Sequence, residues 1–158
     1  MSCDVAAAAF LFFASTSPGM PAPSLALAAI AAPPSVASEP LFRDIVGRAG
    51  HLKQEVEGYR KSLAGASAPV PLTGYAAFQS EIGQLADLDE QGHKTLVARG
   101  SADDLKCILH GISQDLPQKL GAMAAAKTGH DQDQALRDMA YLLNDNVEVI
   151  TSPPQPAA

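Results

Sequence analysis

Hydrophobic residues recur at helical spacing in four stretches of the chain, all between residues 41 and 150. The clearest stretch is 42–63, where small or hydrophobic residues occupy two positions of a seven-residue repeat. These residues are Phe42, Ile45, Ala49, Leu52, Val56, Tyr59 and Leu63. Such a seam predicts an amphipathic helix that packs against other helices. Glycine and proline within residues 65–71 are expected to end it.

The second and third stretches have the same spacing. The second follows Thr73, the expected N-cap, and ends at Gly100. Its hydrophobic residues are Tyr75, Phe78, Ile82, Leu85, Leu96 and Val97. The third opens with Ser-Ala-Asp-Asp at 101–104, which fits a capping box with Asp in place of Glu. Its hydrophobic residues are Leu105, Ile108, Leu109, Ile112, Leu116, Leu120 and Met123. Within it, Pro117 either kinks the helix or begins a new one capped by Asp115.

The fourth stretch begins near His130 and stops at Pro153. Its hydrophobic residues are Leu136, Met139, Ala140, Leu143, Val147 and Ile150. Residues 147–151 leave open whether the last turn stays helical. The connections between the four stretches are short, so neighbouring helices are expected to run antiparallel. The sequence therefore predicts an all-α protein, an up-down-up-down four-helix bundle.

Charge is distributed unevenly along the 158 residues. Residues 1–38 contain 12 Ala, 5 Pro and 6 Ser, with a single charged residue, Asp4. All 11 basic residues and 16 of the 17 acidic ones lie from Glu39 onward. That part therefore has a net charge of −5, compared with −6 for the whole chain. We expect a signal peptide or disordered leader at 1–38, one bundle domain at 39–151 and a disordered Pro-rich tail at 152–158.

The leader favours export to the periplasm or the outside of the cell. It contains ten-residue and shorter apolar runs, at 5–14 and 25–32, followed by small residues at 36–38, as in a secretory signal. The basic residues that normally precede such a run are missing, which leaves the true start open, at Met20 or upstream of Met1. A disordered leader and an uncleaved membrane anchor are the alternatives.

Motifs narrow the function mainly by exclusion. The chain has no glycine-rich phosphate loop, nucleophile elbow, zinc-protease helix or EF-hand loop. Its negative charge and dispersed basic residues exclude a nucleic-acid role. We therefore expect a non-catalytic binding or scaffolding module that binds a protein partner or associates with itself. Membrane contact is expected only through an uncleaved leader.

A metal- or haem-binding bundle is the alternative function. Asp89 and His93 lie one helical turn apart, so their side chains can meet on the second stripe. Asn146 is expected at the same end of the bundle, with Arg43 and Asp104 nearby. These residues predict either a small polar or metal site, with His93 also the one candidate general base, or a hydrated bundle end. A buried pair that sets the helix register is the third possibility.

Few residues of this chain are candidates for haem binding or thiol chemistry. Residues 107–110, Cys-Ile-Leu-His, lack the second cysteine and adjacent histidine of a c-type haem site. Met123 and Met139 lie on stripes, where methionine is commonly a core residue. Cys107 is expected to point outward as a reactive or intermolecular thiol if Cys3 leaves with the signal. The alternatives are an incidental surface cysteine or one packed on the Ala/Pro-rich leader.

Overall fold

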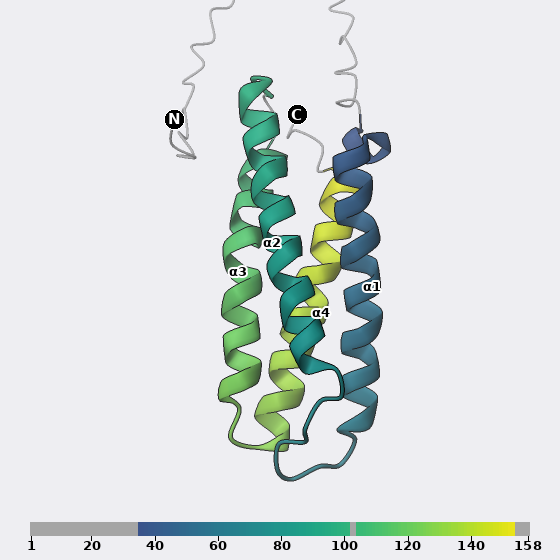
Figure 1. Cartoon of the computed structure of the whole chain (residues 1–158), viewed down its shortest axis with the longest axis vertical. Helices are drawn as coiled ribbons and strands as arrows, with labels where there is room; N and C mark the ends of the chain where they lie inside the picture. The colour runs from purple at the N-terminus through teal and green to yellow at the C-terminus, as the bar shows by residue number, and fades with distance from the viewer. Residues whose placement is uncertain (1–34, 102–103, 154–158) are drawn as a thin grey trace, which may run out of the picture. The chain divides into compact units, whose positions relative to one another are not determined.

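Four long helices form one bundle in the computed structural model, which describes residues 35–101 and 104–153. A short 3-10 turn, η1 (Val36–Ser38), precedes α1 (Pro40–Ser62), α2 (Tyr75–Ala98), α3 (Leu105–Ala125) and α4 (Gly129–Thr151). Each helix packs against the next, and α4 returns to pack against α1 (Figure 1). The prediction of an all-α, up-down-up-down four-helix bundle is confirmed.

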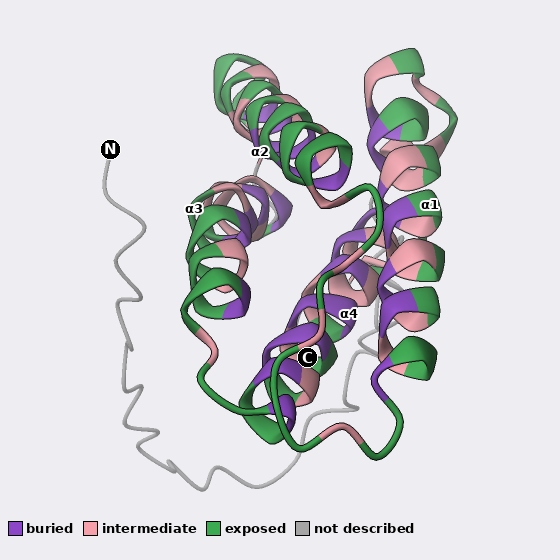
Figure 2. Cartoon of the chain, turned by 60° about the horizontal axis from the view of Figure 1, so that its bottom comes forward, coloured by how far each residue is buried: buried purple, intermediate pink, exposed green. Residues whose placement is uncertain are grey.

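The core consists largely of the predicted hydrophobic stripes (Figure 2). Val97, predicted on the second stripe, is an exception: it is 50% exposed, because it lies one residue past the buried Leu96. On α1, six of the seven seam residues are buried within the helix, and Leu63 is buried just after it. The facing stripes contribute Phe78, Ile82, Leu85, Leu109, Leu116, Leu136, Met139 and Leu143, all fully buried. Burial of such a side chain contributes about 1.5–3 kcal/mol, so these layers are the main favourable term in folding.

The helix ends differ in detail from the predicted caps. The N-cap of α2 is Gly74, whose φ of 77° is left-handed and suits glycine, not Thr73. Asp104 is the N-cap of α3, and its own side chain makes no capping hydrogen bond. A reciprocal capping box is present at α4, between Thr128 and Asp131.

Two questions left open by the sequence are answered by the helices themselves. Pro117 lies inside α3, which continues as one helix on both sides of it. Residues 147–151 remain helical to the end of α4. Proline lacks only its own N–H, so the surrounding packing of Leu116 and its neighbours holds the helix together.

The folded part begins earlier than residue 39. Ser35 caps η1 and donates a hydrogen bond to the carbonyl of Ile150 at 3.5 Å. Val36 and Ala37 are partly buried against the core. Most of the predicted leader, and the tail from 154, lie outside the described residues.

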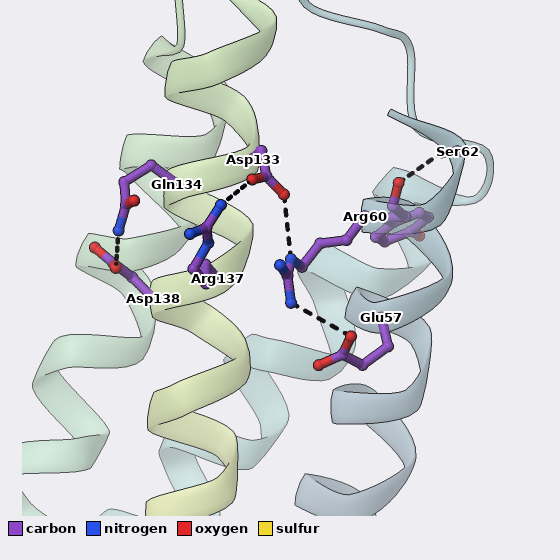
Figure 3. A network of polar contacts seen from close by, with 8 residues as sticks. Glu57, Arg60, Ser62, Asp133, Gln134, Arg137 and Asp138 are labelled. Atoms are coloured by element: carbon purple, nitrogen blue, oxygen red, sulfur yellow. Dashed lines mark hydrogen bonds and ion pairs between the residues drawn. The ribbon is translucent and has the colours of Figure 1, made fainter. Parts of the chain in front are cut away.

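Ionic contacts tie α1 to α4 on the surface (Figure 3). Arg60 pairs with Glu57 at 3.4 Å on its own helix and with Asp133 on α4 at 3.2 Å. Asp133 also accepts a hydrogen bond from Arg137. The guanidinium groups of Arg137 and Arg60 lower the pKa of Asp133. None of the helices in the described part of the chain is long and apolar enough to cross a membrane.

Candidate functional site

A buried polar pair lies inside the bundle. Asp89 on α2 and Asn146 on α4 are each 0% exposed, and Asn146 Nδ2 donates to Asp89 Oδ2 at 2.8 Å. Of the described helices, α2 and α4 share no close backbone contact, so they lie diagonally opposite each other. The hydrogen bond therefore crosses the core. The sequence predicted that Asp89 and Asn146 lie in the same part of the bundle, and their hydrogen bond agrees with this. Both side chains are buried in the core, so they do not form a hydrated bundle end.

Protonation of Asp89 fits this environment. Burial raises the pKa of the Asp89 carboxyl from 3.8 to about 8, and the hydrogen bond from Asn146 offsets only part of that rise. Asp89 Oδ1 and Asn146 Oδ1 have no hydrogen-bond partner among the described residues. Two acceptors without a donor are costly in a core. A proton on the carboxyl supplies a donor, so Asp89 is neutral at pH 7.

The other residues of the predicted polar site lie elsewhere. His93 is half-buried, and its Nδ1 donates to the carbonyl of Lys106 on α3 at 2.6 Å. The predicted contact between Asp89 and His93 is thus replaced by two separate ones, because Asp89 faces the core while His93 faces α3. Arg43 and Asp104 are exposed. The geometry gives a metal site at Asp89 and His93 no support.

His93 instead joins a polar cluster between α2 and α3. The rings of His93 and His110 lie 4.8 Å apart, at an angle of 33°. His110 Nδ1 donates to Glu90 Oε2 at 2.8 Å, and its Nε2 accepts from Gln114 at 2.8 Å. Hydrogen bonds from His110 and then Lys94 lower the pKa of Glu90, which keeps it ionised.

A surface groove adjoins this cluster. We call it the α2–α3 groove; its volume is about 500 Å³. It is lined by Gly83, Ala86, Asp87, Glu90, His110, Ser113, Gln114 and Pro117. A second, smaller hollow of about 340 Å³ lies between the end of α3 and the start of α4, beside Lys127 and His130.

A third polar group links α1 to α2. His51 and Glu55 lie one turn apart on α1, opposite Glu81 on α2. One ligand atom from each lies within 4.8 Å of the others. His51 is exposed, outside the hydrophobic seam of α1, and the sequence alone did not indicate that Glu55 and Glu81 lie beside it. The i, i+4 spacing of His51 and Glu55 was the one available signal, because Glu81 comes from another helix.

The thiol prediction needs correction. Cys107 is half-buried on α3, and its sulfur is in a disulfide. A free, reactive thiol at Cys107 is therefore absent, because a disulfide sulfur provides no thiolate. Cys3, the other cysteine of the chain, lies outside the described residues. Met123 and Met139, weighed as haem ligands, are buried in the core.

Comparison with known proteins adds no relative: no family model, curated protein or solved structure matches the chain. The fold defines the class as a four-helix bundle. Because bundles serve unrelated functions, any function has to be argued from its side chains.

Proposed function

We propose that the protein is an exported, non-catalytic binding module that holds a basic segment of a partner protein in the α2–α3 groove. The observation that carries this proposal is the lining of the groove, which presents Asp87 and Glu90. As the structure describes it, that lining includes no Lys or Arg. Ser113 and Gln114 add a hydroxyl and an amide for hydrogen bonding.

The state of the two carboxylates favours a cationic ligand. Asp87 is exposed, and Glu90 is held ionised by its hydrogen bonds. Lys94 reaches Glu90 Oε1 at 3.3 Å but is itself largely exposed, so an incoming arginine could displace it. Arginine pairs with carboxylates in a bidentate manner, which fixes orientation as well as attraction.

A binding role also agrees with the position of Asp89, the one carboxyl with a strongly raised pKa among the described residues. Asp89 is fully enclosed, so it has no path to a substrate. Asp89 and His93 do not form one site for a metal or haem, since their side chains take different partners.

Peptide binding tests this function. Fluorescence anisotropy would compare nine-residue peptides of alternating Arg and Ser with peptides of alternating Glu and Ser. We expect binding of the basic peptide alone, weakened at least fivefold by Asp87→Asn combined with Glu90→Gln. Asp44→Asn, an exposed change on α1, is the control for general electrostatics. Equal weakening by the control, or no binding of the basic peptide, would contradict the proposal.

Export is tested separately by the intact mass of the protein purified from its source. Because Ser35 and η1 pack on the bundle, we expect the mature chain to keep them and to begin shortly before Ser35. That cleavage lies after Cys3, so a mass taken with and without reductant would also show whether the released segment stays attached through the Cys107 disulfide. A mass that retains residues 1–32 would show that no signal is removed.

A further inference from the structure

His51, Glu55 and Glu81 bring one imidazole and two carboxylates together on the outer face of α1 and α2. His51 Nδ1 lies 3.9 Å from Glu81 Oε2, and the three ligand atoms lie within 4.8 Å of one another. We propose that these three side chains bind a divalent transition-metal ion, with Zn²⁺ as the best fit. This site is distinct from the α2–α3 groove and does not depend on the function proposed there.

The charge balance of the group favours a cation. In the described part of the chain, no Lys or Arg forms an ion pair with Glu55 or Glu81. Two carboxylates held close together repel each other. Other acidic residues on this surface have basic partners, as Asp44 has Arg48 at 3.1 Å. A bound divalent ion would supply the missing positive charge.

The distances suit such an ion after a small adjustment. Zinc bonds of about 2.0–2.2 Å in tetrahedral geometry place neighbouring ligand atoms about 3.4 Å apart. The His51 side chain is 69% exposed and that of Glu81 44% exposed, so rotation of either one closes the gap. The backbone of the two helices need not move.

Tyr59 provides an outer partner for one ligand. Its hydroxyl lies 3.0 Å from Glu55 Oε1 and 2.9 Å from the carbonyl oxygen of Thr73. Hydrogen bonds of this kind orient ligating carboxylates in metal sites.

The donor set discriminates among metals. Calcium and magnesium prefer oxygen ligands alone. One imidazole nitrogen with two carboxylate oxygens suits zinc and its neighbours. Three protein ligands leave the fourth position to solvent.

A metal at this place would also support the bundle. The α1–α2 pair is the least closely packed of the four neighbouring helix pairs. Its two helices are joined by the longest described connection, residues 63–74. An ion that binds only the folded chain raises its stability.

Calorimetric titration of the EDTA-treated full chain with ZnCl₂ tests the site. We expect one Zn²⁺ per chain, bound at least tenfold more weakly by His51→Asn and by Glu81→Gln. Glu57→Gln and His130→Asn are matched controls, because they remove the same groups elsewhere on the surface. Both should bind as the wild type does. Equal affinity in all four variants, or no binding by the wild type, would overturn the proposal.

A second measurement uses the wild type alone, in case a variant folds poorly. Long-range ¹H–¹⁵N spectra resolve the four histidine side chains, so each ring can be followed as Zn²⁺ is added. The ring nitrogens of His51 should shift and those of His93 and His110 should not. Shifts confined to His93 and His110 would place the metal between α2 and α3 and refute this site.

Discussion

Asp89→Asn is predicted to stabilise the bundle at neutral pH while leaving the shape of the core unchanged. An amide at position 89 can accept from Asn146 Nδ2 and also donate, as the neutral carboxyl does. It cannot ionise. The variant therefore removes the cost of protonating Asp89 on folding and keeps the hydrogen bond that crosses the core.

The magnitude follows from the raised pKa. Asp89 titrates near 3.8 when unfolded and near 8 when folded, so between these values the folded state holds one more proton. Its contribution to stability is greatest below pH 3.8 and is lost as pH rises to 8. The slope is about 1.4 kcal/mol per pH unit, which amounts to about 4 kcal/mol at pH 7. That is a large part of the 5–15 kcal/mol typical of a domain.

Urea denaturation of both proteins at half-unit steps from pH 4.5 to 8.5 measures this effect. Their difference in unfolding free energy should increase steadily in favour of the variant and level off near pH 8. Taking the difference cancels the other carboxyls, such as Asp133, whose lowered pKa acts in the opposite direction. A difference that stays constant across the range would refute the assignment of a proton to Asp89.

Three further substitutions test the packing and the caps by urea denaturation. Gly92→Ala adds a methyl 3.1 Å from Leu109 Cδ1, whereas the methyl of Gly83→Ala meets open space. The unfolding free energy of Gly92→Ala should therefore be at least about 1 kcal/mol lower than that of Gly83→Ala. Equal unfolding free energies would contradict the close approach at Gly92. Thr128→Ala removes the capping box of α4 and should cost about 1 kcal/mol, whereas an unchanged midpoint would show the cap to be redundant. Tyr59→Phe removes a half-enclosed hydroxyl and should cost about 0.5–1.5 kcal/mol, so a more stable variant would argue against that hydrogen bond.

The helices were predictable because each depends on residues close together in sequence. The repeat from Phe42 to Leu63 specifies one buried face without reference to the other helices. The caps were harder to predict, because several short patterns compete near each helix start. Thr73 and Gly74 are both acceptable cap residues; the left-handed turn selects glycine, and the Thr73 carbonyl accepts from Tyr59.

The polar contacts depend on which helix face meets which neighbour. Asp89 and His93 fall on one stripe of the sequence pattern. A step of four residues, however, rotates the side chain by 40° about the helix axis, so Asp89 faces the core and His93 faces α3. The pairing of His110 with Glu90 joins residues 20 positions apart. Spacing along one helix cannot reveal such contacts, so the sequence indicated a polar region and mistook its members.

A polar pair across the diagonal gives the bundle a register that its hydrophobic layers alone do not. Leucine and isoleucine recur in successive layers, so a slip of one turn between α2 and α4 would exchange one apolar contact for another. The same slip would separate Asn146 from Asp89 and leave both buried without partners, at about 1–3 kcal/mol each. The pair therefore penalises the slipped arrangement more than it stabilises the native one, as buried polar residues do in other helical assemblies. An amide at position 89 preserves this discrimination, which is why Asp89→Asn separates the cost of protonating the carboxyl on folding from the value of the hydrogen bond.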